Sequence, residues 1–155
     1  MDRRRLHFLN SEALTTIFGR WPSFHDSEVV ALRLNRTGED AMPSVEIDIH
    51  LWETGGDVDA AGRYVTGHHT LAQLRFEDVD EVALEGFNAQ NVLFDLEIEG
   101  PALDSQRWSV SLNASYGVSA SFSCASAIVL RAQPFEPTTT SWARRDVADT
   151  GLPPG

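Results

Sequence analysis

The chain has 155 residues, 42% of them apolar, which is enough for one domain with a buried core and excludes a disordered acidic tail. Its net charge of −11 is concentrated in residues 39–104, where sixteen acidic residues and two Arg give −14, whereas the rest of the chain has a net charge of +3. Such a segment repels phosphate backbones and anionic headgroups, so the charge disfavours nucleic acid and membranes and favours a basic protein partner.

The first residues suggest neither a signal peptide nor a membrane anchor, because residues 1–10 carry a basic start without a long apolar run. We therefore expect a cytoplasmic protein. Residues 11–19 predict a short helix, which Asn10 or Ser11 can cap and Gly19 can end. Its apolar residues share one face, which predicts that the helix covers the edge of a core.

After Pro22 the hydrophobic period changes from helical to two, which predicts strands. The clearest alternation lies at Val45, Ile47, Ile49 and Leu51. Seven or eight such segments follow one another with short turns between them, and short turns favour antiparallel pairing. They lie at residues 30–34, 45–51, 70–76, 82–84, 92–98, 108–114, 118–124 and 128–131.

These elements predict an α+β, β-rich domain over residues 1–133. One short N-terminal helix packs on a largely antiparallel sheet of about seven strands, either open or folded over as a sandwich or half-barrel. Residues 54–69 are expected to form the longest insertion. Residues 134–155 are rich in Pro and Thr, and we expect a poorly ordered C-terminal tail.

The densest polar cluster is Trp21-Pro22-Ser23-Phe24-His25-Asp26-Ser27-Glu28. A carboxylate beside an imidazole can form a general base, but adjacent residues in an extended segment point to opposite faces. The alternative is a strand-entry corner, in which Trp21 and Phe24 are buried and the polar side chains bond to the turn backbone. The second interpretation is the simpler one.

A metal site would have to gather residues that are scattered along the chain, and none has the spacing of a helical zinc motif. Asp48 and His50 share the outward face of one predicted strand, so they could converge on an ion, although a solvated face is the simpler interpretation. His68 and His69 are expected in an exposed loop. The other members of such a set would be His25 and Asp26.

Catalytic motifs are also missing from the sequence. Cys124 alternates in register with buried apolar residues, which predicts an inert thiol, and a single cysteine excludes an intramolecular disulfide. There is no G-x-S-x-G elbow and no phosphate-binding glycine loop. We therefore predict no catalytic residue, no metal and no cofactor.

The acidic middle of the chain has two interpretations, a solubilising surface or a partner interface. In the second, Trp52, Tyr64 and Phe87 supply apolar anchors. The carboxylates predicted to contact the partner are Glu53, Asp57, Asp59, Asp78, Asp80 and Glu81.

The stretch from Trp21 to Val29 resembles the opening signature of immunity protein 50, a family from bacterial polymorphic toxin systems. Further stretches are similar to later family positions: residues 74–76, 86–92, 116–117 and 122–124. The resemblance covers about residues 14–133. It implies a protein that neutralises a cognate toxin by binding it, without catalysis. Within the first motif, the residues expected to build the fold are Trp21, Pro22, Phe24, His25, Asp26 and Glu28.

The leading hypothesis is a non-enzymatic cytoplasmic protein that binds a cognate toxin, and the charge distribution favours a basic toxin. The alternative is a metal-binding protein or small hydrolase that uses His25 with Asp26 and Asp48 with His50. A third hypothesis, small-molecule binding in a concavity of the sheet, has no support from any motif.

Overall fold

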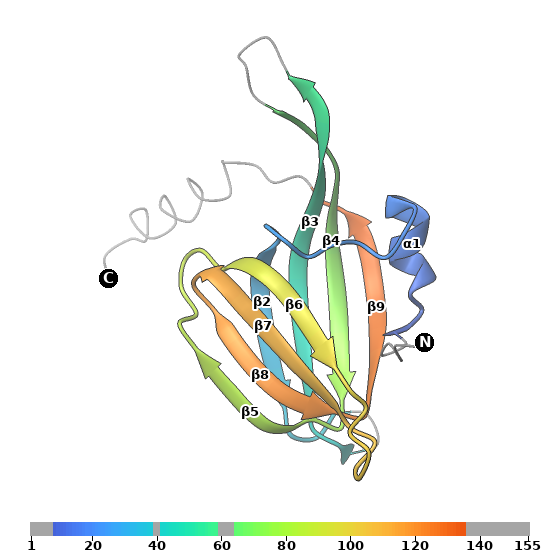
Figure 1. Ribbon diagram of the computed structural model, residues 1–155, viewed down its shortest axis with the longest axis vertical. Helices are drawn as coiled ribbons and strands as arrows, with labels where there is room; N and C mark the ends of the chain where they lie inside the picture. The colour runs from blue at the N-terminus through green and yellow to red at the C-terminus, as the bar shows by residue number, and fades with distance from the viewer. Residues whose placement is uncertain (1–7, 39–40, 59–63, 136–155) are drawn as a thin grey trace, which may run out of the picture.

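The computed structural model describes residues 8–38, 41–58 and 64–135, of which 54–58 and 64–66 are described by their backbone alone. This part of the chain forms one helix and nine strands (Figure 1). The helix α1 spans Glu12–Phe18. The strands are β1 (Phe8–Leu9), β2 (Glu28–Asn35), β3 (Ser44–Val58), β4 (Tyr64–Glu77), β5 (Asp80–Glu85), β6 (Val92–Glu99), β7 (Trp108–Tyr116), β8 (Ser119–Cys124) and β9 (Ser126–Pro134).

All nine strands belong to one sheet, in the order β1-β9-β4-β3-β2-β6-β7-β8-β5. Every pairing is antiparallel except that of β1 with β9, which is parallel. The predicted β-rich α+β class is confirmed. The sheet has more strands than the seven predicted, partly because the two-residue strand β1 is too short to show a period.

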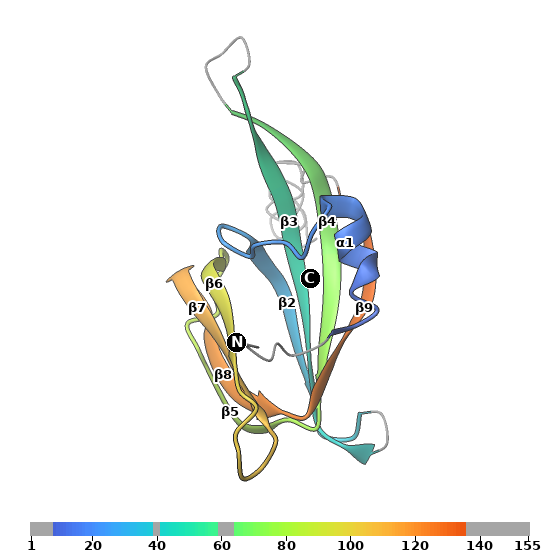
Figure 2. The same cartoon turned by 45° about the vertical axis from the view of Figure 1, so that its right-hand side comes forward.

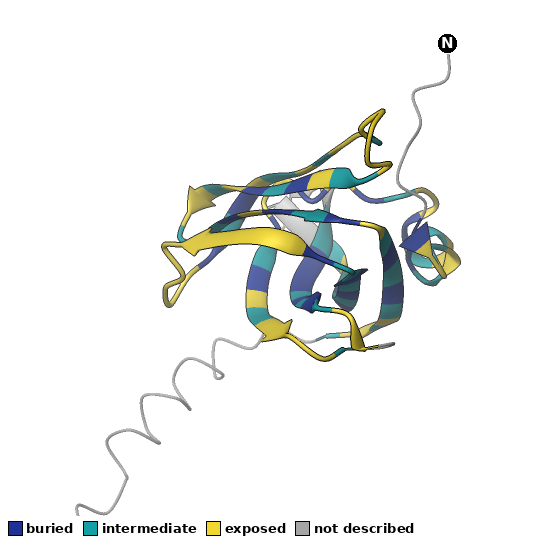
Figure 3. Ribbon diagram, turned by 90° about the horizontal axis from the view of Figure 1, so that it is seen from below, coloured by how far each residue is buried: buried dark blue, intermediate teal, exposed yellow. Residues whose placement is uncertain are grey.

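The sheet folds over so that two groups of strands face each other (Figure 2). One group is β2, β3, β4 and β9, and the other is β6, β7, β8 and β5. Their inward residues meet in one core, where the rings of Phe76 on β4 and Phe122 on β8 lie 5.1 Å apart. Along the strands, buried residues alternate with more exposed ones (Figure 3). This alternation confirms the inward direction predicted for Val45, Ile47, Ile49 and Leu51.

Two connections cross from one group of strands to the other. β4 continues into β5 through Asp78 and Val79, although these strands lie far apart in the sheet order. β8 continues into β9 through Ala125, whose N–H donates to the carbonyl of Glu77 at 3.0 Å. The two crossings are therefore bonded to each other, which fixes the groups at this end of the fold.

The helix α1 packs against β9 and β4 and buries Leu14 and Phe18. It ends at Gly19, as predicted: the glycine has a left-handed φ of 77°, and its N–H donates to the carbonyl of Thr15. The predicted side-chain cap is absent: Ser11 makes no cap hydrogen bond, and Asn10 donates to the carbonyl of Val129 instead. This one described helix is too short to cross a membrane.

The predicted insertion at residues 54–69 is wrong at both ends. β3 continues to Val58 and β4 begins at Tyr64, so most of this segment is a long antiparallel hairpin that projects from the sheet (Figure 1). Residues 54–57 read Thr-Gly-Gly-Asp, a sequence typical of a turn, but the pairing of β3 with β4 continues through it, with register shifts between Leu51 and Glu53 and between Thr54 and Val58. The C-terminal tail remains a prediction, since residues 136–155 lie outside the described residues.

Candidate functional site

The segment from Trp21 to Glu28 forms the corner that joins the two groups of strands. The backbone N–H of Ser27 donates to the carbonyl of Phe24 at 3.1 Å, and its hydroxyl donates to the same carbonyl. Asp26 then donates to the carbonyl of Leu93, and Leu93 donates back to Ser27, both at 2.9 Å. Because β2 pairs with β6 only at Glu28, these backbone bonds supply most of the joint.

His25 and Asp26 approach each other, which the extended-strand argument did not predict. Asp26 adopts a left-handed φ of 66°, so the chain turns and brings its carboxylate to 3.5 Å from Nε2 of His25. The other ring nitrogen, Nδ1, lies 2.8 Å from the carbonyl of Phe94 and donates to it in the matching tautomer. Both side chains are exposed, and the nearby hydroxyls are turned to backbone: Ser23 accepts from the N–H of His25, and Ser27 bonds to Phe24.

The apolar residues of the same segment lie in the core. The ring of Trp21 is 4.7 Å from that of Phe8 and 5.7 Å from that of Phe24, and Pro22 is buried beside them. Glu28 is half-buried, and desolvation raises the pKa of its carboxyl group despite an opposing hydrogen bond from the backbone of Asn91. The segment therefore has the arrangement of a strand-entry corner.

Two later segments singled out in the sequence meet this corner. The buried side chain of Asn91 accepts hydrogen bonds from the N–H groups of Asn88 and Val118 at 2.9 and 3.1 Å. Its amide nitrogen donates to the carbonyl of Asn88 at 2.8 Å, while the backbone carbonyl of Asn91 accepts from Val29. Residues 86–92 and 116–118 thus complete the joint between β2 and β6.

Asp48 and His50 do not converge on a common site, because each contacts a different partner, and the solvated face expected for them is wrong for His50, which is buried. The carboxylate of Asp48 is held by both terminal nitrogens of Arg33. His50 is buried beneath the rings of Trp52 and Phe135, and its Nε2 lies 3.0 Å from Nδ1 of His69. Burial, together with the neighbouring His69, lowers the pKa of His50 to about 4.

His68 and His69 lie in β4 rather than in a loop. His68 is exposed, with Nε2 3.8 Å from the carboxylate of Glu53. Within the described ranges, no three His, Cys, Asp or Glu side chains lie close enough together to hold a metal ion.

Cys124 is fully buried, as predicted, and burial raises the pKa of its thiol to about 11.

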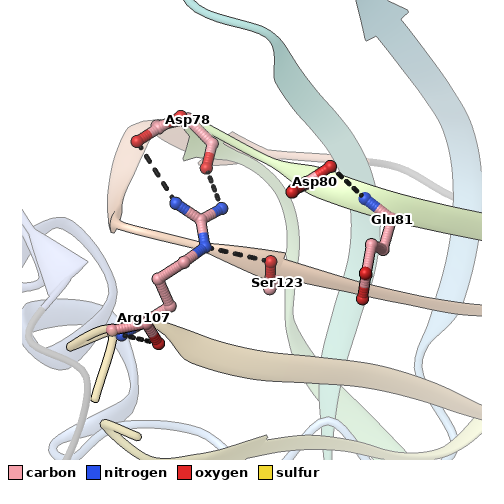
Figure 4. Close-up of polar contacts among 6 residues, drawn as sticks. Asp78, Asp80, Glu81, Arg107 and Ser123 are labelled. Atoms are coloured by element: carbon pink, nitrogen blue, oxygen red, sulfur yellow. Dashed lines mark hydrogen bonds and ion pairs between the residues drawn. The ribbon is translucent and has the colours of Figure 1, made fainter.

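The carboxylates predicted to contact a partner are placed differently from one another. Asp78 is tied to Arg107, whose guanidinium bonds to its carboxylate at 3.3 Å, to its backbone carbonyl and to the hydroxyl of Ser123 (Figure 4). Asp80 and Glu81 are exposed on β5, where the N–H of Glu81 donates to Asp80 (Figure 4). Glu53 lies near His68, as stated above. Asp59 and the side chain of Asp57 fall outside the described residues.

The outer side of β6, β7, β8 and β5 carries a pattern that the sequence reasoning missed. We call it the serine face: its floor is formed by Ser109, Ser111, Asn113, Ser119, Ser121, Ser123 and Ala83, and its borders by Asp95, Glu97 and Glu99 on β6 and Asp80 and Glu85 on β5. The register sets these residues opposite each other, as in the row Glu97, Ser111, Ser121 and Ala83. The signal was available, because serine alternates with buried apolar residues along β7 and β8.

The outer side of β2, β3 and β4 differs in its charge pairing. There Arg33 contacts Glu46 and Asp48, and Arg75 lies 3.6 Å from Glu77. On the serine face, none of the five border carboxylates forms an ion pair with a described residue, and the nearby Arg107 is bound to Asp78 and Ser123. The serine face is therefore the side on which the negative charge is not neutralised by Arg.

Of the three predicted apolar anchors, Phe87 is exposed, Trp52 packs on the ring of His50, and the side chain of Tyr64 is not described. Other large exposed apolar side chains lie at Leu84 on β5, Phe94 on β6 and Tyr116 on β7. Apolar contact area is thus present beside the acidic strands.

A family model described as immunity protein 50 matches residues 10–135. No curated protein and no solved structure matches the chain.

Proposed function

The chain belongs to the immunity protein 50 family, and we propose that it neutralises a cognate toxin in the cytoplasm by binding it directly, without catalysing a reaction. The described histidines and carboxylates support this proposal over catalysis. The hydroxyls of Ser23 and Ser27, near His25 and Asp26, bond to backbone groups, and Asp48 and His50 are bound to separate partners.

We propose further that the toxin surface in contact with the chain is basic. The observation that carries this step is the contrast between the two outer sides of the sheet, one with its carboxylates paired to Arg and the other with five that are not. Like charges that lie close together repel each other unless a partner neutralises them. A basic partner would relieve this repulsion and would associate faster through electrostatic steering.

The first test separates binding from catalysis by stoichiometry. Toxin encoded beside the gene for this chain is purified, and its activity is titrated with increasing amounts of the chain. Direct binding predicts that inhibition is complete near a fixed molar ratio and does not deepen with longer incubation. Inactivation by amounts far below that ratio would show turnover and would contradict the proposal.

The second test concerns charge. Reversing Asp80 and Glu81 to Lys should weaken protection of toxin-expressing cells, whereas the same change at the exposed Glu12 and Asp104 should not. Asp57 and Asp59 form a second pair to reverse. Asp78 is left unchanged because its carboxylate is bound to Arg107. The association rate should also fall with added salt. Full protection by a folded Asp80→Lys, Glu81→Lys variant, with no salt dependence, would remove the basic partner.

A further inference from the structure

We propose that the serine face binds one basic α-helix of the toxin, laid along the strands between the two carboxylate borders. This inference rests on the proposed function and adds the surface and the shape of its partner.

The floor is open and lined by small side chains. A hollow of about 370 Å³ lies over it, and its lining includes Ala83, Ser111, Asn113, Ser119 and Ser121 together with the larger Leu84, Glu85 and Leu112. Small side chains permit close approach of a partner and lose little conformational entropy on binding. Their hydroxyl and amide groups can also satisfy polar groups that a partner brings, as Asn113 already does for Asp95 at 2.6 Å.

The dimensions match a helix. Three strand spacings separate the border on β6 from the border on β5, which corresponds to roughly 14 Å, and a helix with its side chains measures about 10–12 Å across. Along β6, the alternate positions of Asp95, Glu97 and Glu99 are spaced by about 6.7 Å. Basic residues four apart on a helix are spaced by about 6 Å, so one helix can offer a cation to each carboxylate in turn.

Addition of a partner strand to the edge of the sheet is disfavoured. β5 is the edge strand, and its register shifts between Asp80 and Ala83, where Glu81 has a left-handed φ of 55°. Bulges and exposed charges on an edge strand both oppose pairing with another chain. The partner is therefore expected on the face of these strands rather than at the edge.

The test uses the full chain and its purified toxin. Glu85→Gln with Glu97→Gln removes one charge from each border, and Glu12→Gln with Asp104→Asn makes the same charge change elsewhere. We expect the border variant to bind about 3- to 30-fold more weakly and the matched control to bind like the unmodified chain.

Ser121→Tyr, which fills the hollow, should weaken binding by about tenfold or more, whereas Thr16→Tyr on the exposed side of α1 should not.

A photo-crosslinking residue at position 121 identifies what lies on the floor. Crosslinks to an Arg- or Lys-rich helix of the toxin support the proposal, and crosslinks to a strand or loop overturn it.

If the unmodified chain binds the toxin, and the border variant and Ser121→Tyr bind it equally well, then the serine face is not the docking surface. The proposed function stands in that case. If the unmodified chain does not bind the toxin, the proposed function fails and this inference fails with it.

Discussion

Gly117 lies so close to Asn91 that a Cβ on the glycine would be 2.6 Å from the amide oxygen of Asn91. It would also clash with the carbonyl oxygen of Gln90, and the backbone of Gly117 has a left-handed φ of 87°. The amide oxygen of Asn91 is the acceptor for Asn88 and Val118, so the glycine leaves room for the hydrogen bonds that tie the segment before β6 to the turn between β7 and β8.

Gly117→Ala should therefore destabilise the fold by about 2–4 kcal/mol, because it adds a steric clash to an unfavourable φ. Urea unfolding monitored by tryptophan fluorescence measures the change. Gly67→Ala is the matched control, since no atom lies within 4 Å of a Cβ at that position, and we expect its effect to stay within about 1 kcal/mol. Equal stability of the two variants would contradict the role given to this contact.

Buried His50 should make the stability dependent on pH. Its pKa is about 4 in the folded chain and about 6.5 when unfolded, so between these values the unfolded state binds more protons. Stability is accordingly lost as the pH falls from 6.5 towards 4, by an amount on the order of 1–3 kcal/mol. His50→Gln should lessen this loss in urea unfolding at a series of pH values, and His68→Gln, at an exposed position, should not. Parallel pH profiles for the unmodified chain and His50→Gln would refute the prediction.

Cys124 should be nearly unreactive in the folded protein. Burial raises the pKa of its thiol from 9.0 to about 11, which lowers the thiolate population about 100-fold near neutral pH, and the side chain is also inaccessible. Labelling with a thiol reagent should be fast in urea, where the chain is unfolded. In buffer, labelling should be no faster than the opening of the structure that exposes the thiol. Arg107→Gln should accelerate it, because the lost contacts to Asp78 and Ser123 loosen the adjacent crossing. Rapid labelling of the unmodified chain under native conditions would show that the thiol is accessible.

Removal of metal ions should leave the protein unchanged, because no three His, Cys, Asp or Glu side chains gather within the described residues, and several of them are held by other groups. Arg33 binds Asp48, His69 lies against His50, and His25 bonds to the backbone of Phe94. We expect untagged protein to contain no stoichiometric metal, and its Tm with and without chelator to agree within about 1 °C. A metal near one equivalent, together with a lower Tm in chelator, would support the metal-binding alternative instead.

The sequence predicted the strands well because one side of each is buried, and burial imposes a period of two along residues such as those of β3 and β8. It could not predict the pairing of Asp78 with Arg107, which are 29 residues apart and meet only when β4 crosses into β5. The burial of His50 depends on Phe135, from the far end of the chain. Side-chain environment is therefore decided by tertiary contacts that the local pattern does not encode.

Candidate site residues were harder to predict than strands. The acidic segment was evident from the sequence. Which carboxylates have an Arg beside them could not be predicted, because that depends on the register of seven strands. His25 and Asp26 illustrate the opposite case, because a single left-handed residue brought together two side chains that an extended strand would have kept apart. One backbone angle was enough to reverse that prediction.

The parallel pairing of β1 with β9 also constrains how the protein is made. β9 lies between β1 and β4, so the N-terminal strand has no neighbour in the sheet until the chain has been synthesised to Ala127 and Ile128. Contacts of such long sequence separation form late and fold slowly. A nascent chain released before β9 would lack the strand that joins its beginning to the rest of the sheet, although the pairings among β2 to β8 need no later residue.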